Sequence, residues 1–559
     1  MPASAWLRAL AALLLVGGCS GQSSGPPQIT SEVDDWRDEV IYEVIVDRFD
    51  DGDTSNDWIG AIGTEPGDLA RWQGGDWAGL RRRLGYLQRL GVTTLWISPV
   101  VDNIERTDYQ DGYHGYWASD FTRTNPHFGS LDDLRGLVDD AHARGMKVIV
   151  DIVANHVGRV FYYDFDGDGS MDPDEAEPPF SADGPYDAAL GWLVDPPRVF
   201  VGSDGETRAL GPDDFHRRGQ FGDGSQEQKE LGDFPTGLRD LDTENPAVVQ
   251  AMVDTYARWV ALTDVDGFRL DAVPHAPHGF WSQFAGDLRE RLAAMGKDRF
   301  LLLGEVFDGD PTRLAGYTVS GGLDSVFDFS LEGRVIENFI LDGFAASDAA
   351  PALESYRQYY PTQAQPYGVG LSPWQARVAF ADNHDIPRLR YWIDDPYVSD
   401  LAMTVIFTVD AIPAVYYGTE QDFSGGWGNA SREVMWQSGF GEDGRTFRHI
   451  AKLAAIRRTS TALRRGQLRV VYASDISARE HGPGAGLLAW ERFTGDDRVL
   501  VAVNGHPTDR AEARVPTGFD PGTELVDRLT DGARTVTVDA GGTVALSIPP
   551  REALILVSR

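Results

Sequence analysis

One stretch decides how the rest of this chain is interpreted: Val265-Asp266-Gly267-Phe268-Arg269-Leu270-Asp271-Ala272-Val273-Pro274-His275. It follows an amphipathic run over 247–262 that predicts a helix, and its own pattern predicts a short strand that runs into a loop. Side chains two apart on a strand share a face, so Arg269 and Asp271 project together. A neighbouring guanidinium favours the ionised carboxylate. Asp271 is therefore a candidate nucleophile or electrostatic stabiliser, although a plain ion pair at a strand end explains this stretch equally well in isolation.

Seven further apolar runs predict buried strands, with helical patterns between most of them. The eight predicted strands are residues 40–46, 92–97, 147–153, 267–271, 300–305, 323–329, 377–381 and 412–416. Strands that alternate with helices in this way predict an α/β fold of parallel units closed into a (β/α)8 TIM barrel. The long Gly-, Asp- and Pro-rich connection after the third strand predicts an inserted subdomain, because structureless loops of that length are uncommon. Short β runs after Gln467 predict a C-terminal antiparallel β-sandwich.

The N-terminus predicts export. Arg8 precedes a short apolar run, and small residues lead to Cys19, the only cysteine, so no intramolecular disulfide is possible. This pattern resembles the bacterial lipobox, whose cysteine is lipidated after cleavage; an ordinary signal peptide is the alternative. We therefore expect attachment to the bacterial cell envelope through Cys19, or an extracellular location. The predicted domains are 1–19 lipoprotein-type signal peptide, 20–36 flexible tether, 37–156 and 233–465 catalytic barrel, 157–232 inserted calcium-binding subdomain and 466–559 β-sandwich.

Composition narrows the class of ligand. The chain has 86 acidic and 50 basic residues, a net charge of −36, which disfavours nucleic acid and anionic membrane surfaces as partners. A salty habitat explains this acidity equally well. With 15 Trp, 19 Tyr and 26 Phe, the chain has aromatic residues for a binding surface in addition to a large core.

Polar residues follow four of the predicted strands, where barrel enzymes place their active sites. They are Asp151-Ile152-Val153-Ala154-Asn155-His156, the opening stretch, Gly304-Glu305-Val306 and Asp382-Asn383-His384-Asp385. Three carboxylates, Asp271, Glu305 and Asp385, are thus expected to converge. Cleavage of a glycosidic bond needs one ionised and one protonated carboxyl group. The apolar run Leu301-Leu302-Leu303 favours a raised pKa, and hence the acid role, for Glu305.

Three further motifs accompany these strand ends: Gly112-Tyr113-His114-Gly115-Tyr116-Trp117, Leu238-Arg239-Asp240-Leu241-Asp242 and Ile412-Pro413-Ala414-Val415-Tyr416-Tyr417-Gly418-Thr419-Glu420. With all of these motifs, the chain resembles the α-amylase superfamily, glycoside hydrolase family 13, over about residues 38–559. The resemblance implies retaining hydrolysis of α-1,4-glucosidic bonds in starch, glycogen or maltodextrins by double displacement. It implies Asp271 as nucleophile, Glu305 as general acid/base and Asp385 as transition-state stabiliser. The implied substrate-binding residues are Arg269, which orients Asp271, Tyr116, which stacks on the sugar, and His114, His156 and His384, which hydrogen-bond it. The partner is then an α-glucan, and we expect a monomer.

Up to three structural Ca²⁺ sites are predicted. A twelve-residue loop places oxygen ligands with the spacing that Ca²⁺ loops require, at Asp164, Asp166, Asp168, Ser170, Asp172 and Glu175, with Gly167 at its turn. A solvated acidic loop is the alternative there. The second set resembles a site of cyclodextrin glucanotransferases and related bacterial amylases: Asp51, Asp53, Asn56, Asp57, Gly74 and Asp76. The resemblance implies a third site with Asn155, Asp240 and the carbonyl of His275.

Two features depart from the family pattern. Pro274 stands where the family often has a lysine that contacts the sugar on the acceptor side of the cleaved bond, so acceptor binding and product pattern stay open. The family's additional starch-binding domains are not recognisable after the β-sandwich, which favours hydrolysis over cyclisation. The alternatives are a 4-α-glucan transferase or a cyclomaltodextrinase- or neopullulanase-like hydrolase. A non-catalytic glucan-binding lipoprotein is disfavoured, because binding does not need all three carboxylates.

Overall fold

The structure, a computed structural model, describes residues 28–30, 33–222, 224–319, 321–495 and 497–559. The predicted signal peptide with Cys19, and most of the predicted tether, lie outside these residues. Within the described part of the chain, no helix has both the length and the apolar character needed to cross a membrane.

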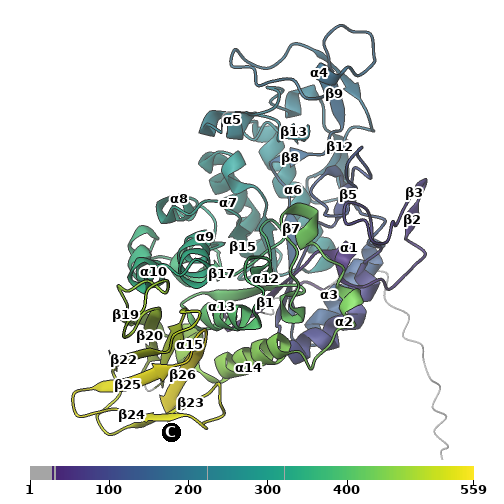
Figure 1. The fold of residues 1–559 in the computed structure, drawn as a ribbon. Helices are drawn as coiled ribbons and strands as arrows, with labels where there is room; N and C mark the ends of the chain where they lie inside the picture. Colours follow the sequence, from purple (N-terminus) through teal and green to yellow (C-terminus); the bar gives the residue numbers. More distant parts are fainter. Residues whose placement is uncertain (1–27, 31–32, 223, 320, 496) are drawn as a thin grey trace, which may run out of the picture.

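Eight parallel strands form the barrel that the sequence predicts (Figure 1). In chain order they are β1 (Ile41–Val44), β4 (Thr94–Ile97), β7 (Lys147–Ile152), β14 (Gly267–Leu270), β15 (Leu301–Gly304), β16 (Ser325–Val326), β17 (Val378–Ala379) and β18 (Ile412–Tyr416). The sheet order is β16-β15-β14-β7-β4-β1-β18-β17. A single parallel bridge between Phe327 and Val378 joins the two edge strands and closes the ring. The fold prediction is therefore confirmed.

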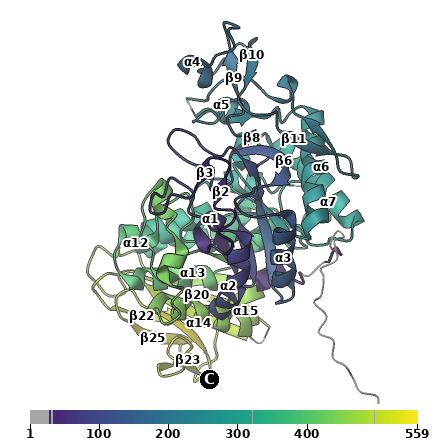
Figure 2. The same cartoon turned by 90° about the vertical axis from the view of Figure 1, so that its right-hand side faces the viewer.

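Helices surround the barrel (Figure 2). The longer ones are α2 (Trp77–Leu90), α3 (Leu131–His142), α6 (Pro246–Thr263), α7 (His278–Ala294), α10 (Ala346–Leu353), α13 (Pro396–Thr408) and α14 (Arg445–Thr459). Shorter ones are α1 (Val46–Phe49), α8 (Pro311–Gly316), α9 (Phe329–Leu331), α11 (Pro373–Ala376), α12 (Leu389–Trp392) and α15 (Thr461–Arg465), and a π-helical segment, η4, spans Glu332–Leu341. The helix predicted over 247–262 is confirmed as α6, which Asn245 caps by accepting a hydrogen bond from Ala247 N.

Strand alternation divides the hydrophobic core in two. On β7, Ile149 packs inside the barrel with Trp96, Leu301 and other interior residues. Its neighbours Val148 and Val150 point the other way and pack into the layer between barrel and helices. Successive side chains of a strand face opposite sides, so both faces of these strands are buried and their sequences are apolar throughout.

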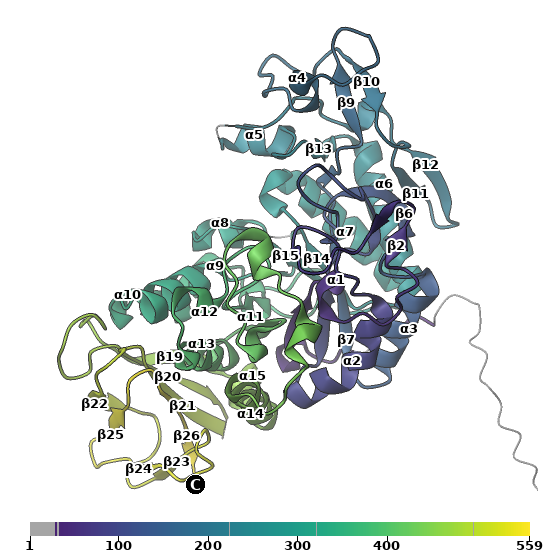
Figure 3. The same ribbon diagram turned by 45° about the vertical axis from the view of Figure 1, so that its right-hand side comes forward.

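The long third connection is folded, as predicted for an insertion, and lies above the strand ends (Figure 3). It contains β8 (His156–Val157), β9 (Phe161–Asp164), α4 (Pro173–Ala176), β10 (Ala189–Trp192), β11 (Arg198–Val201), β12 (Glu206–Ala209), α5 (Gln226–Leu231) and β13 (Arg239–Asp240). β13 pairs antiparallel with β8 at its base. Buried Arg239 joins its parts, because the guanidinium contacts the Asp233 carboxylate at 2.6 Å and donates to the carbonyls of Phe161 and Ala176.

The C-terminal part is all-β, as predicted, and lies at the far end of the molecule from the insertion (Figure 3). Its strands are β19 (Gln467–Ala473), β20 (Leu487–Thr494), β21 (Asp497–Asn504), β22 (Ala511–Pro516), β23 (Glu524–Asp527), β24 (Thr535–Thr537), β25 (Thr543–Ile548) and β26 (Ala553–Ser558). Six form one antiparallel sheet, and β22 pairs with β25. Buried Arg492 ties this part to the barrel by donating to the Thr408 and Val409 carbonyls at the end of α13.

Candidate active site

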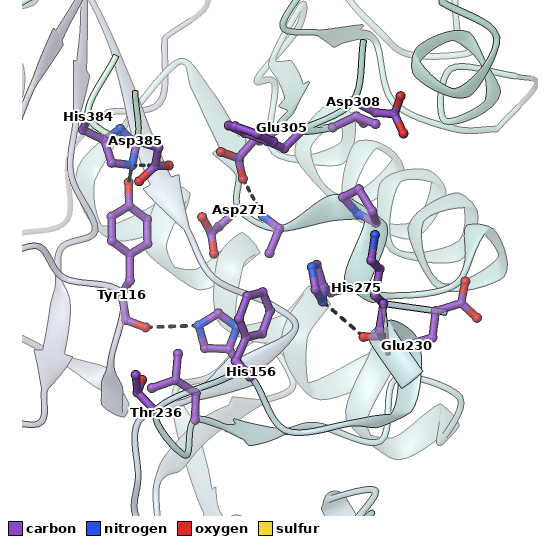
Figure 4. Close-up of a pocket in the computed structure, with 18 of the residues that line it drawn as sticks. Tyr116, His156, Glu230, Thr236, Asp271, His275, Glu305, Asp308, His384 and Asp385 are labelled. Atoms are coloured by element: carbon purple, nitrogen blue, oxygen red, sulfur yellow. Dashed lines mark hydrogen bonds and ion pairs between the residues drawn. The ribbon is translucent and has the colours of Figure 1, made fainter. Parts of the chain in front are cut away.

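A cavity of about 1210 Å³ opens at the carboxyl ends of the strands, between the barrel and the insertion. Its walls include all three predicted catalytic carboxylates and the four predicted sugar-binding ring residues: Asp271, Glu305, Asp385, His114, Tyr116, His156 and His384. Figure 4 shows that Asp271 and Glu305 face a common space, with His384 and Asp385 on one side and Glu230 and Asp308 on the other. The predicted convergence of these residues is therefore observed.

The guanidinium of Arg269 holds this carboxylate cluster together. Arg269 is 1% exposed and lies on β14, in register with Asp151 of β7. Its Nη1 is 2.6 Å from Asp271 Oδ1 and 3.1 Å from Asp151 Oδ1, and its Nη2 is 2.7 Å from Glu305 Oε1. The ion pair predicted from the sequence is thus one part of a larger arrangement, in which the guanidinium of Arg269 bridges the carboxyl groups of Asp271 and Glu305.

Glu305 is held as a weak acid. Burial raises its pKa to about 8, and the nearby charges of Asp271 and Asp385 act in the same direction, whereas Arg269 opposes them. Glu305 Oε2 accepts a hydrogen bond from Ala272 N at 3.0 Å, which fixes the carboxyl group beside the end of β14. A carboxyl group with this pKa is largely protonated at neutral pH. Glu305 is therefore able to donate a proton to a leaving group.

Asp385 has the opposite character. Burial alone would raise its pKa, but the charge of His384 and its hydrogen bond, with Arg432 and Arg269, lower it well below the ordinary value. The Asp385 carboxylate lies 3.1 Å from His384 Nε2 and 3.2 Å from Arg432 Nη2. Although burial disfavours the imidazolium, Asp385 and Glu43 together raise the pKa of His384 to about 10. An ionised Asp385 and a charged His384 thus stand side by side.

Tyr116 connects the two halves of the site. Its hydroxyl donates to Asp151 Oδ2 at 2.8 Å and lies 2.9 Å from His384 Nε2. Its backbone N–H donates to His114 Nδ1, and its carbonyl lies 3.2 Å from His156 Nε2. Burial lowers the pKa of both His114 and His156, so these rings are neutral hydrogen-bonding groups. His156 is partly engaged with the protein itself, because its Nε2 faces the Tyr116 carbonyl.

Several residues in the cavity wall or directly behind it escaped the sequence analysis. Phe307, 57% exposed, and Tyr317 line the cavity. Phe307 follows Glu305 by two positions, so its place in the strand-end motif was a usable signal. Arg432 contacts Asp385, and Glu43 contacts His384. Neither Arg432 nor Glu43 belongs to a recognised motif, so the sequence contained no signal for them.

The insertion covers the loop that contains Pro274. Gln226 of α5 donates a hydrogen bond to the Pro274 carbonyl at 3.0 Å, and the Lys229 carbonyl lies 3.2 Å from His275 Nδ1. Gln226, Lys229 and Glu230 all line the cavity. Residues of α5 therefore add polar groups beside Pro274, whose own carbonyl is taken up by Gln226.

The predicted metal-ligand set at residues 51–76 fits a hard cation. Asp51 Oδ1, Asn56 Oδ1 and Asp57 Oδ1 are buried and accept no hydrogen bond from any described residue. Burial and the neighbouring Asp51, Asp76 and Asp47 raise the pKa of Asp57 to about 6, which shows how closely the acidic groups gather. At Gly74 a Cβ atom would lie 2.6 Å from Asp57 Oδ1, so only glycine leaves this space open. Unpaired buried oxygens around an open space suit a Ca²⁺ ion.

Not every residue of that set is equally free. Both carboxylate oxygens of Asp76 accept backbone hydrogen bonds, including one from Gly79 N at 2.6 Å that caps α2. Asp53 Oδ1 accepts a hydrogen bond from Ser55 N. Asp76 is fully buried and organises the loop over the cation position, so a local structural role explains its place as well as ligation does.

The third predicted ligand set, at the base of the insertion, also has buried oxygens without a hydrogen-bond partner in the described chain. Asn155 and Asp240 are each 1% exposed, and Asn155 Oδ1 and Asp240 Oδ1 have no hydrogen-bond partner within the described chain. The second oxygen of Asp240 lies 2.5 Å from His216 Nδ1, a contact that the sequence analysis missed. The adjoining segments meet where Leu241 N donates to the Asn155 carbonyl. These two oxygens fit a cation that joins barrel and insertion.

The acidic loop of the insertion brings its first ligand positions together. Carboxylate oxygens of Asp164, Asp166 and Asp168 lie within 4.8 Å of one another. Glu175, 3% exposed, folds back and accepts hydrogen bonds from Phe165 N and Asp172 N. Asp168 accepts from Ser170, so the loop keeps the compact turn that the twelve-residue spacing predicts.

The comparisons with known proteins agree with this geometry. Residues 43–452 match the family described as "Alpha amylase, catalytic domain", and residues 480–559 match "Alpha amylase, C-terminal all-beta domain". The chain belongs to the α-amylase family. The resemblance read from the strand-end motifs is thereby confirmed. Among curated α-amylase family relatives, the chain is 33% identical over 553 residues to an α-amylase of Streptomyces lividans; the match covers 88% of this chain and 57% of that protein. The chain thus spans little more than half the length of this relative.

Two solved structures of the family resemble the whole fold. An α-amylase from Geobacillus thermoleovorans, complexed with acarbose, has a TM-score of 0.71 and 29% identity and covers 94% of this chain and 99% of its own. A cyclomaltodextrin glucanotransferase described as the first with a three-domain distribution has a TM-score of 0.74 and 28% identity, with coverages of 93% and 99%. Because that glucanotransferase matches the same extent of chain, the number of domains does not separate hydrolase from transferase. The domain composition therefore does not favour hydrolysis over cyclisation, contrary to the expectation from the sequence.

Proposed function

We propose that this chain is a retaining glycoside hydrolase that cleaves α-1,4-glucosidic bonds in starch, glycogen or maltodextrins. The observation that carries the proposal is the Arg269 fork, which contacts Asp271 at 2.6 Å and Glu305 at 2.7 Å. A pair of carboxyl groups bridged by one guanidinium stands close together, as a retaining mechanism requires. The raised pKa of Glu305 supports the acid role, and family membership supports the substrate class.

In the first step Asp271 Oδ attacks the anomeric carbon while Glu305 transfers its proton to the glycosidic oxygen, which leaves with the acceptor part of the chain. The product of this step is a glycosyl ester on Asp271. In the second step ionised Glu305 takes a proton from water, and that water releases the sugar from Asp271. Asp385, His384 and Arg432 supply charged hydrogen-bonding groups for the sugar hydroxyls beside the reacting carbon.

The configuration of the released sugar tests the mechanism. Two displacements at one carbon restore the α-anomer, so maltoheptaose cleaved in an NMR tube is expected to give α-anomeric signals before mutarotation. A single displacement by water would give the β-anomer first, and this result would refute Asp271 as a covalent nucleophile.

The pKa of Glu305 predicts the alkaline limit of activity. The first step needs protonated Glu305, so kcat/KM is full below this pKa and falls as pH rises through about 8. The measurement is kcat/KM for a soluble maltodextrin between pH 5 and pH 10, a range of roughly two pH units or more around the expected limb. An alkaline limb centred near pH 5 would contradict the environment described for Glu305.

We further propose that Ca²⁺ binds the unpaired oxygens of Asp51, Asn56 and Asp57 and those of Asn155 and Asp240, with the acidic loop as a third position. Bound there, the ion would supply positive charge that joins separate segments, and it takes no part in the bond cleavage. Excess EDTA is expected to lower the Tm by several degrees, because a ligand at about 1,000 times its Kd adds about 4 kcal/mol to stability. Added Ca²⁺ is expected to restore the Tm.

Asp57→Asn is expected to reduce this calcium-dependent shift. The matched control is Asp68→Asn, which alters an exposed carboxylate of the same loop region. A Tm that is the same with EDTA and with Ca²⁺ would remove the proposal of structural calcium.

A glucan transferase or a cyclodextrin-cleaving hydrolase is the second candidate function. The observation that favours it is exposed Phe307, which lines the cavity together with residues of α5 and offers a ring face for a sugar acceptor in place of water. A time course of products from soluble starch and from γ-cyclodextrin separates the candidates. Linear maltooligosaccharides from starch support the α-amylase, whereas cyclic products or rapid opening of γ-cyclodextrin support the second candidate.

We also propose export and lipidation at Cys19, and action as a monomer. The charged and apolar pattern before Cys19 supports the first of these. The monomer proposal is supported by the cavity, because one chain supplies Asp271, Glu305 and Asp385 together.

A further inference from the structure

Three exposed aromatic side chains gather outside the active-site cavity. Tyr391, Trp392 and Trp427 are 50%, 49% and 60% exposed. The ring centroids of Tyr391 and Trp392 are 5.2 Å apart, and those of Trp392 and Trp427 are 6.4 Å apart. Aromatic rings that stay in water as a group indicate a binding surface. We call these three residues the aromatic platform.

The platform is held in place by polar contacts to buried Arg388 and to Glu433. Arg388, just before α12, donates its backbone N–H to the Gly425 carbonyl, and its Nε lies 3.2 Å from Glu433 Oε2. The other oxygen of Glu433 accepts from Ser424 N and Gly425 N at 3.0 and 2.6 Å. These contacts join α12, which carries Tyr391 and Trp392, to the loop that carries Trp427. A preformed surface loses little conformational freedom when a ligand binds.

Gly426 brings the two segments into direct contact. A Cβ atom at this position would lie 2.8 Å from the Tyr391 ring, so only glycine lets the backbone approach the ring this closely. In Figure 2, α12 lies at the outer edge of the barrel. The exposed rings therefore belong to a fixed part of the surface.

The platform continues the wall of the cavity. Gly428 and Asn429, which follow Trp427, line the cavity. Asn429 accepts a hydrogen bond from the Tyr113 hydroxyl at 2.5 Å and donates to Gln110. The other segment of the platform also starts at the cavity, because α12 begins four residues after Asp385. The platform thus adjoins the Asp385 side, which Figure 4 shows away from Glu230 and Asp308.

We propose that Tyr391, Trp392 and Trp427 form an auxiliary binding site for an α-glucan chain that extends out of the cavity past Asp385. This inference rests on the proposed function for the identity of the chain in the cavity. The C–H face of a pyranose ring is apolar and packs on an aromatic ring, while its hydroxyl rim stays in water. A neutral polymer also meets no repulsion from a protein of net charge −36. Continuity with the cavity wall favours such a polymer over a separate protein partner.

The test compares binding with catalysis in the double variant W392A/W427A. We expect its Kd for soluble starch, from retardation in starch-containing native gels, to rise at least about fivefold, which equals about 1 kcal/mol. The KM for starch is expected to rise similarly. In contrast, kcat/KM for a short chromogenic maltotrioside, which fits within the cavity, is expected to stay within about twofold of the wild-type value.

Two further variants isolate the cause. W392F/W427F keeps two ring faces and is expected to retain most of the binding, which separates lost stacking from a damaged fold. Y359A/Y367A removes two exposed aromatic side chains, 45% and 71% exposed, that do not line the cavity. This control is expected to bind starch like the wild type.

The proposal is overturned if starch does not retard the wild type, if W392A/W427A is retarded as strongly as the wild type, or if the control loses as much binding. A protein that binds starch through the platform but cleaves no glucan would sink the proposed function and leave the platform intact. Active cleavage with unaltered binding by W392A/W427A would do the reverse.

Discussion

Asp271→Asn is expected to lower kcat on starch by roughly 10⁴-fold or more, the size of loss found when a nucleophile is removed. The amide is nearly the same size as the carboxylate, and Arg269 keeps its contacts to Asp151 and Glu305. The fold is therefore expected to survive, as circular dichroism and an unchanged Tm would show. Steady-state kinetics on starch measure the loss, and mass spectrometry of wild type trapped with a fluorinated maltosyl fluoride is expected to find the label on Asp271.

The matched control is Asp308→Asn. Asp308 also lines the cavity, but its carboxylate contacts Arg313 at 2.7 Å and stands away from the Arg269 fork. Its loss is expected to cost less than about tenfold in kcat. If Asp271→Asn cleaved starch as fast as Asp308→Asn, Asp271 would have no catalytic role.

Glu305→Gln is expected to lower kcat/KM on starch by about 10³-fold, because a sugar leaving group needs a proton. On α-maltosyl fluoride the loss of the first step is expected to be less than about tenfold, since fluoride leaves without strong acid assistance. Azide, an anion that needs no general base, is expected to accelerate turnover of this substrate and to give α-maltosyl azide. Gas–liquid chromatography or NMR of the products provides the measurement.

Equal losses on starch and on the fluoride would contradict the acid/base role, because a residue that only shapes the site affects both substrates alike. Asp385→Asn serves as the comparison. In the proposed mechanism Asp385 stabilises charge and transfers no proton, so its variant is expected to lose activity on both substrates and to gain nothing from azide.

Much of the fold was predictable because local signals agree with the tertiary structure. The strands β1, β4, β7 and β15 are buried on both faces, so their sequences are almost continuously apolar. Such runs predict a buried strand without any decision about which side chains face inward. Predicted strand ends were less accurate. The strand predicted over 323–329 is reduced to Ser325–Val326, because Asp324 turns its carboxylate toward Leu302 N and Asp328 caps the helix α9.

The convergence of Asp271, Glu305 and Asp385 was predictable for a related reason. Each directly follows a strand of a closed barrel, and parallel strands deliver their ends to the same rim. The raised pKa of Glu305 was predicted from Leu301-Leu302-Leu303, and its direction agrees. The cause is broader than that run, because Asp271 and Asp385 also raise the pKa and only their arrangement in space brings them near.

Contacts between distant segments were beyond the sequence. Arg432 reaches Asp385 across 47 positions, and Glu43 reaches His384 across 341. The α5 helix over Pro274 and the aromatic platform likewise depend on how loops fold back onto the barrel. No periodic pattern marks such pairs, since neither partner's neighbours need to be apolar.

The sequence by itself thus determined the barrel, the order of its strands and the three carboxylates at their ends, because these follow from strand burial and chain order. Only the tertiary structure decided how Arg269 joins Asp271 to Glu305, which buried oxygens have no hydrogen-bond partner, and which exposed rings stand together beside the cavity. Those features arise from contacts between side chains that are distant in the sequence and come together only when the chain folds. No single stretch of sequence specifies such contacts.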